Sequence, residues 1–226
     1  MLPILTTNTL HLWYATLDEF NPDSVKSVLS PDEQSKALRF IFDSDRDRYI
    51  VGRGILRLLL SAYNKMKPED IHFQYGSHGK PSLSGPIRFN VSHSEAMILY
   101  AVAHEREVGV DVEFIRPLAE QDALVEEYLT VNEQFQLRAL PYRQQLEGFL
   151  TCWTQKEAYL KACGIGLVDA LNRVDLTQIS AGESPWWIHN LTPTLSCPGY
   201  VCALAIEGSQ PDLVITPIQP ATLGNI

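Results

Sequence analysis

Two acidic residues in one short segment could bind a metal ion. In the segment VGVDVE (108–113), Asp111 and Glu113 alternate with valines. Successive side chains of a β-strand point to opposite faces, so both acids share one face and the valines share the other, facing a core. Two carboxylates on one face repel each other unless a cation lies between them, and Mg²⁺ prefers such oxygen ligands. The pattern therefore indicates either a magnesium site or a solvent-exposed strand face.

A second candidate lies on a helix, in the segment WTQKEAYLKACGIGL (153–167). Glu157 and Lys161 are i,i+4 neighbours in the favourable order, which is typical of a surface salt bridge. Their face also carries Trp153 and ends at a Gly-Ile-Gly-Leu turn, which is unusual for a solvated surface. Glu157 lies 157 − 111 = 46 residues after Asp111, so only the tertiary fold could bring the two acids together.

Several polar and basic residues upstream could bind phosphate groups. Ser92 and His93, in FNVSHS at a predicted strand end, can donate hydrogen bonds to phosphate, or can belong to a polar turn. In the GKP segment, the rigid Pro81 could orient the side chain of Lys80 toward a ligand. The same sequence is equally compatible with a solvent-exposed turn. Six basic residues lie within 22 positions, against three aspartates at 43, 45 and 47, and these are Lys36, Arg39, Arg46, Arg48, Arg53 and Arg57.

The elements that must position these residues form two groups. Helices are predicted from Pro31 and from about Ser44, followed by strands at 71–75, 87–91, 97–103 and 108–114, the last two as a hairpin. A capping box at 130–133 and a long helix from Pro141 to Gly164 follow, then three strand-like runs between 186 and 218. We expect an α+β protein with two lobes, residues 1–110 and 111–226, and find no internal sequence repeat.

Composition narrows the possible functions. The 226-residue chain has 18 basic and 27 acidic residues, a net charge of 18 − 27 = −9, which argues against nucleic acid as a partner. No apolar run approaches the ~20 residues of a membrane span, and the N-terminal segment lacks the features of a signal peptide. The four cysteines contain no CxxC pair. We therefore expect a cytoplasmic protein with free, mostly buried thiols and no membrane association.

Together these motifs resemble a known enzyme family. The order GKP, FNVSHS, GVDVE and WTQKEAYLKACGIGL, within about residues 31–167, is similar to that of the 4′-phosphopantetheinyl transferases. The length matches the large, Sfp-like, pseudodimeric class, because members of the small class are about half as long and form trimers. The resemblance implies two similar α+β lobes related by a pseudo-twofold axis, with coenzyme A between them. It also implies transfer of the phosphopantetheine arm to a serine of an apo acyl or peptidyl carrier protein, with release of 3′,5′-ADP, by a monomer.

The resemblance also implies roles for individual residues. Magnesium would be held by Asp111, Glu113 and Glu157, of which Glu113 is the least secure, since some relatives use water at that position. We expect Glu157 to be the general base and Lys161 to assist the departing phosphate. Glu33 departs from relatives that place a lysine there for the 3′-phosphate, and Lys36 fits the same basic helix more weakly. The coenzyme's phosphates and adenosine end would be held by Arg39, Lys80, Pro81, Ser92 and His93, beside Asp111 and Lys161.

Two other functions remain open at this point. A Mg²⁺-dependent nucleotide pyrophosphatase would use the same carboxylates but pass the phosphoryl group to water. A non-catalytic protein that binds coenzyme A or a carrier would have no need of a base. For a transferase, we expect an apolar docking surface for the acidic carrier around the helices at 117–140, assisted by Arg138 or Arg143.

Overall fold

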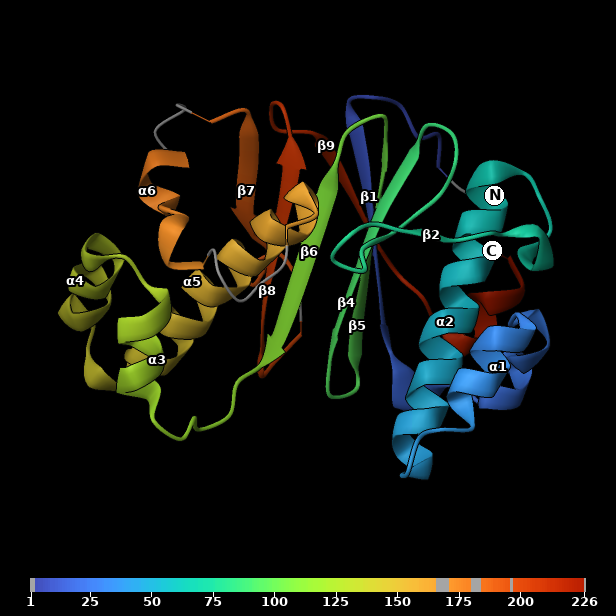
Figure 1. Ribbon diagram of the computed structural model, residues 1–226, viewed down its shortest axis with the longest axis horizontal. Coiled ribbons are helices and arrows are strands. Elements are labelled where there is room, and N and C mark those ends of the chain that lie inside the picture. The colour runs from blue at the N-terminus through green and yellow to red at the C-terminus, as the bar shows by residue number, and fades with distance from the viewer. Residues whose placement is uncertain (1–2, 166–170, 180–183, 196, 226) are drawn as a thin grey trace.

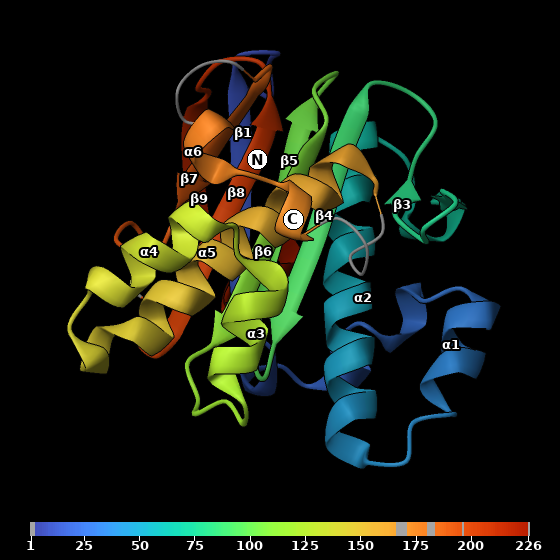
Figure 2. The same ribbon diagram turned by 60° about the vertical axis from the view of Figure 1, so that its left-hand side comes forward.

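The computed structural model describes residues 3–165, 171–179, 184–195 and 197–225. Two β-sheets lie beside each other at the centre of the molecule, and one long helix covers the outer face of each sheet (Figure 1). Shorter helices lie outside the long ones, α1 beside α2 and both α3 and α4 beside α5 (Figure 2). The predicted α+β fold with two lobes is confirmed.

The first lobe contains a four-stranded sheet in the order β4-β5-β1-β9. Strand β1 pairs antiparallel with β5 and parallel with β9, the last strand of the chain. Helix α2 packs on one face of this sheet through residues such as Ile55 and Leu59, and β2 and β3 form a separate two-stranded ladder. The elements of this lobe are β1 (Thr9–Thr16), α1 (Pro31–Ala37), α2 (Asp43–Asn64), β2 (Gln74–Tyr75), β3 (Pro81–Ser82), β4 (Ile87–Ser94), β5 (Met97–His104) and β9 (Asp212–Pro217).

The second lobe contains a three-stranded sheet in the order β6-β8-β7. Helix α5 lies against this sheet through small residues, with Ala158 and Ala162 packed on Ala203 and Ala205. Its elements are β6 (Val108–Phe114), α3 (Gln121–Tyr128), α4 (Val131–Ala139), α5 (Tyr142–Cys163), α6 (Leu176–Gln178), β7 (Trp186–Asn190) and β8 (Tyr200–Glu207). The predicted division at residues 110 and 111 stays a prediction.

The inner faces of the two sheets share one apolar core. Leu12 and Leu99 from the first sheet pack in the same cluster as Val110 and Leu204 from the second. The valines of VGVDVE thus face this core, as their alternation predicts, and are almost completely buried. Burial of apolar side chains on both sheets stabilises the contact between the lobes by roughly 25 cal/mol for each Å² removed from water. The opposite face of β6 is thereby left for α5.

Two predictions about strands are wrong. Residues 97–103 and 108–114 do not form a hairpin, because both edges of β5 are already paired, one with β4 and the other with β1, while β6 pairs with β8. The strand expected at 71–75 is reduced to Gln74–Tyr75, since the carbonyl oxygen of Ile71 instead accepts a hydrogen bond from Arg57 Nη1 (3.1 Å).

The predicted helix boundaries agree closely with the structure. Helix α4 begins with the predicted capping box, in which the backbone N–H of Thr130 donates to Glu133 Oε2 (2.8 Å). Helix α5 ends at Gly164, whose φ of 69° lies in the left-handed region that glycine adopts without strain. All four cysteines are free, as predicted. No helix within the described ranges combines the length and the apolar character needed to cross a membrane. The predicted Gly-Ile-Gly-Leu turn includes Gly166 and Leu167, which lie outside the described residues.

Candidate functional site

Strand β4 presents a row of polar side chains to β6, in the other lobe. Asn90 Oδ1 accepts a hydrogen bond from Val110 N (2.9 Å), and Ser92 Oγ donates to Asp111 Oδ1 (2.8 Å). Ser94 Oγ donates to Glu113 Oε2 (2.9 Å). The spacing of two between these residues follows from the alternation of a strand. The predicted alignment of both acids on one face of β6 is therefore confirmed, and β4 holds that face in register.

Helix α5 crosses β6 very closely and brings its polar residues to the same place. A Cβ atom on Gly109 would lie 2.0 Å from the carbonyl oxygen of Ala158, so only glycine permits this approach. As a result, Lys161 Nζ reaches both Asp111 Oδ1 (2.5 Å) and Ser92 Oγ (3.0 Å). The 50 residues between Asp111 and Lys161 are thus bridged by the fold.

Negative charge dominates this junction. Burial raises the pKa of Glu157 to about 7, and the nearby charges of Asp111 and Glu113 add to this effect against the opposing influence of Lys161. Burial also raises the pKa of Glu113, with a further contribution from Asp111, while the hydrogen bond from Ser94 lowers it. One ammonium group thus faces three carboxylates, which is an arrangement that favours an additional cation.

The donor set can be tested against a magnesium ion. Asp111 Oδ2 is buried and accepts no hydrogen bond from any described residue, while Oδ1 of the same carboxylate already contacts a cation, Lys161. A buried carboxylate oxygen without a partner is costly, and a metal ion would satisfy it. Within the described ranges, no three His, Cys, Asp or Glu side chains are already arranged around one point. Mg²⁺ commonly takes one or two protein carboxylates and completes its shell with water and phosphate oxygens, so the residues fit this ion.

A cavity of about 480 Å³ lies in the first lobe, and Asp111, Glu113 and Glu157 do not line it. Two of the residues expected to bind the coenzyme, Pro81 and His93, line it together with Lys36. His93 follows Ser92 in β4 and so points to the opposite face of the strand, and Ser92, Asp111 and Lys161 do not line the cavity. Desolvation in the cleft lowers the pKa of His93, and the positive charges of Lys161 and Arg48 lower it further. His93 is thus neutral at pH 7 and can serve as a hydrogen-bond donor rather than a fixed charge.

Two residues predicted to bind the phosphates of the coenzyme, Lys80 and Arg39, do not line this cavity. Lys80 Nζ contacts Glu107 Oε2 (2.8 Å) and the carbonyl oxygen of Ala162 (2.9 Å), so it ties the GKP loop to the second lobe. It lines another cavity, on the side of Glu107. Arg39 lies exposed on the turn after α1, and its side chain makes no hydrogen bond or ion pair with another described residue. Their roles toward the coenzyme stay predictions.

Sequence reasoning named Arg48 and Arg53 only as members of a basic segment and missed Tyr49, and all three line the cavity. The signal was present, since all three belong to the basic segment of α2, but the segment alone does not say which side chains turn inward. The guanidinium group of Arg48 is already paired with Asp18, because Arg48 Nε donates a hydrogen bond to Asp18 Oδ1 (2.7 Å). Asn90 was also missed, although it stands two residues before Ser92 in the same alternating row.

Comparison with known proteins gives two family matches that together cover most of the chain. Residues 11–105 match the family described as "4′-phosphopantetheinyl transferase, N-terminal", and residues 107–205 match the "4′-phosphopantetheinyl transferase superfamily". The two matches meet between β5 and β6, where the chain passes from the first sheet to the second.

Individual relatives agree with these matches. The chain is 35% identical over 219 residues to the 4′-phosphopantetheinyl transferase HetI of Nostoc sp., an alignment that covers 90% of each chain. It is 39% identical over 156 residues to AcpT of Escherichia coli, covering 68% of this chain and 76% of that one. It is also similar to Sfp of Bacillus subtilis, at 27% identity over 143 residues and 62% of each chain.

Proposed function

Since the chain belongs to the 4′-phosphopantetheinyl transferase superfamily, of the Sfp type, we propose that the junction of β4, β6 and α5 is where it carries out the transfer. The enzyme moves the phosphopantetheine moiety of coenzyme A to carrier proteins. The observation that best supports the location is the convergence of Asp111, Ser92 and Lys161 across the contact between the lobes. We further propose that it acts as a cytoplasmic monomer on the serine of an apo acyl or peptidyl carrier.

Asp111, Glu113 and Glu157 would hold the magnesium ion. A magnesium ion held there would supply charge neutralisation at the diphosphate of the coenzyme. Lys161 is suited to accompany the departing phosphate, because its ammonium is a compact charge on a flexible stem and already lies between Ser92 and Asp111. When a diphosphate enters, the ammonium can turn from Asp111 toward the phosphate oxygens, which leaves Asp111 to the metal ion.

Glu157 is suited to take the proton of the carrier serine. A general base works best when its pKa is close to the working pH, and burial gives Glu157 a pKa of about 7. The transfer then has a defined proton path, from the serine hydroxyl to Glu157, and a defined leaving group, 3′,5′-ADP. The serine oxygen forms a bond to the β-phosphorus of the coenzyme as the bond to the bridging oxygen breaks.

The direct test is to incubate the protein with an apo carrier, coenzyme A and Mg²⁺ and to weigh the carrier by mass spectrometry. We expect the carrier to gain one phosphopantetheine group, and 3′,5′-ADP to appear in equal amount. Release of phosphopantetheine from coenzyme A without a carrier would instead indicate a pyrophosphatase. If neither reaction occurred but coenzyme A bound, the protein would be a non-catalytic binder.

A variant tests the assignment of Lys161. Lys161→Ala should lower kcat by about a hundredfold while the Kd for coenzyme A changes by only a few-fold, because the ammonium acts mainly as charge develops. Equal loss of both quantities would make Lys161 a binding residue. A control is Lys67→Ala, which removes an exposed ammonium group of the first lobe that does not line the cavity.

The carrier surface around α3 and α4 also stays a proposal. Arg138 and Arg143 are both exposed, as a docking role requires, and Arg138 lies 3.6 Å from Glu126. Charge reversal of both arginines should raise the KM for the carrier and leave the KM for coenzyme A unchanged. An unchanged KM for the carrier would remove this surface from consideration.

A further inference from the structure

Strands β4 and β6 lie side by side at the contact between the lobes, yet side chains rather than a backbone ladder join them (Figure 1). Each is an edge strand of its own sheet, with β4 paired to β5 and β6 paired to β8. The backbone groups on the open edge of β6 therefore need other partners. Asn90 Oδ1 accepts a hydrogen bond from the N–H of Val110 (2.9 Å), and Ser94 Oγ accepts one from the N–H of Phe114 (3.1 Å).

Ser94 makes a second contact, and this one involves an acid. A hydroxyl group has one proton to donate. Because the oxygen of Ser94 already accepts from the N–H of Phe114, its proton is directed to the acceptor on the other side, Glu113 Oε2, at 2.9 Å. Glu113 Oε1 makes no hydrogen bond or ion pair with a described residue. The hydroxyl thus fixes one oxygen of the carboxylate and leaves the other one available.

Ser92 treats Asp111 in the same way. Its oxygen accepts a hydrogen bond from Lys161 Nζ (3.0 Å), and its proton is donated to Asp111 Oδ1 (2.8 Å). Asp111 Oδ2 is buried and has no hydrogen-bond partner among the described residues. In both pairs the serine of β4 lies 19 residues before the acid of β6. Two successive outward positions of one strand therefore present two acids with one oxygen held and one oxygen free.

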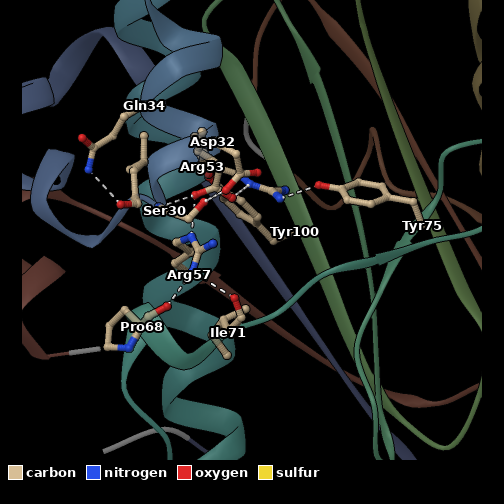
Figure 3. Close-up of polar contacts among 12 residues, drawn as sticks. Ser30, Asp32, Gln34, Arg53, Arg57, Pro68, Ile71, Tyr75 and Tyr100 are labelled. Carbon is tan, nitrogen blue, oxygen red and sulfur yellow. Dashed lines mark hydrogen bonds and ion pairs between the residues drawn. The ribbon is translucent and has the colours of Figure 1, made fainter.

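Polar contacts that serve the fold alone have a different pattern. Figure 3 shows Arg57 directed at Pro68 and Ile71, and its Nη1 donates to both carbonyl oxygens, at 2.6 and 3.1 Å. That side chain satisfies backbone oxygens that would otherwise lack a partner. At the junction, by contrast, the contacts between the lobes leave oxygens of two neighbouring acids unpaired. Such oxygens are costly in an apoprotein and suited to a divalent ion.

We propose that Ser94 is a positioning residue for the divalent ion, because it holds Oε2 of Glu113 and so makes Oε1 the oxygen that this acid offers. The inference rests on the proposed metal site and explains what makes Glu113 available to it. Without the hydroxyl, the half-buried side chain of Glu113 could turn between several rotamers, and binding an ion would require it to lose that freedom. Hydrogen-bond partners of metal ligands commonly orient them in this way.

Binding of Mn²⁺, a paramagnetic substitute for Mg²⁺, tests the proposal without carrier or turnover. Electron paramagnetic resonance measures free Mn²⁺, and hence its Kd, in the presence of coenzyme A, with coenzyme A alone as the baseline. Ser94→Ala should weaken Mn²⁺ binding by about tenfold, the lower end of the loss expected when a metal ligand loses its hydrogen-bond partner. Ser94→Thr keeps the hydroxyl and should restore most of the affinity.

Two comparisons separate positioning from a purely structural role. Thr192→Val is the matched control, since its hydroxyl accepts from the N–H of Cys202 (3.0 Å), as Ser94 does from Phe114, but contacts no carboxylate. It should leave the Kd for Mn²⁺ unchanged. In a Glu113→Gln background, Ser94→Ala should have no further effect on this Kd, because the serine acts through Glu113.

The outcomes also distinguish this inference from the proposed function. An undiminished effect of Ser94→Ala in the Glu113→Gln background would mean that Ser94 only joins the two strands, and would overturn the inference. Should Ser94→Ala fail to fold, Ser94→Cys replaces it, since a thiol of similar size is a weak donor. An unchanged Kd in that variant would equally contradict the proposal. If the natural protein with coenzyme A bound no Mn²⁺, the proposed metal site itself would fail, and this inference with it.

Discussion

The two lobes solve the same structural problem with nearly the same residues. Leu29–Gln34 (LSPDEQ) and Leu129–Gln134 (LTVNEQ) are 100 residues apart, and both segments begin a short helix with a capping box. In both, the glutamine side chain donates to the leucine carbonyl, at 2.9 Å in each lobe. The sequence analysis found no internal repeat, because three identities within six positions stand out only once the equivalent helices are known.

The long helices α2 and α5 carry different side chains at three equivalent positions. Counted from the starts of α2 and α5, Glu157 and Lys161 correspond to Leu58 and Ala62. In the other direction, Arg53 corresponds to Cys152. In the proposed site, α5 of the second lobe would supply the reacting groups, whereas α2 of the first lobe lines the cavity proposed for the coenzyme. A shared scaffold with different side chains at these three positions would give two similar lobes different tasks.

The largest effect is expected from replacing Glu157 of α5, a position at which α2 carries Leu58 and no acid. Glu157→Gln should reduce turnover by about 10³-fold, within the range that general bases contribute, because the amide cannot accept the serine proton. The folded structure should survive, since the variant removes a buried group that resists ionisation. Steady-state kinetics at saturating Mg²⁺ measure this effect. Near-normal turnover would contradict the role of Glu157, and Leu58→Gln in the first lobe is the control at the equivalent position.

The second prediction compares the two buried acids, Glu33 and Glu133, which contact two cations and one cation respectively. Lys156→Met removes the one cation of Glu133, and should destabilise the protein by about 3–5 kcal/mol, the cost of leaving a buried charge unpaired. Arg57→Met should cost less, because Arg53 still contacts Glu33. Urea unfolding measures both free energies. If the two variants lost equal stability, the second cation of the first lobe would contribute nothing to the charge of its cluster.

The sequence predicted which residues meet at the junction better than it predicted their surroundings. The shared face of Asp111 and Glu113 follows from the alternation of a strand, and the helix of Glu157 and Lys161 follows from its spacing and its glycine stop. Sequence periodicity carries no information on which strands pair, so the hairpin after β5 was wrongly assigned. Likewise, the basic residues of α2 were identified, but only tertiary contacts separate Arg53, which lines the cavity, from Arg57, which holds backbone carbonyls.

The third prediction concerns pH. The pKa of Glu157 is about 7 in the folded protein, above the ordinary value of 4.5, so the folded state retains a proton that the unfolded state releases. Its stabilising contribution is complete below pH 4.5 and is lost as pH rises through 7, a change of about 3 kcal/mol. Unfolding free energies at pH 5 and pH 8 without divalent ions measure this slope.

The control for this pH effect is Glu157→Gln, which should remove most of the slope between pH 5 and 8. Added Mg²⁺ should raise the stability of the natural protein chiefly at the higher pH, where the carboxylate is ionised and can bind the ion. The same slope in Glu157→Gln would show that other groups are responsible. The equivalent residue of the first lobe, Leu58, cannot titrate, so this position contributes to the slope in the second lobe only.

The smallest effect should come from the caps, where the lobes are most alike. Ser30→Ala and Thr130→Ala each remove a hydroxyl at the start of a short helix, a change that typically costs about 1 kcal/mol. We expect Thr130→Ala to cost more, because Pro31 fixes the first helical residue in the first lobe whereas Val131 leaves the second lobe dependent on its cap. The caps share no contacts, so the double variant should lose the sum of the two values in urea unfolding. Equal costs would mean that the proline adds nothing, and that the capping box alone begins both helices.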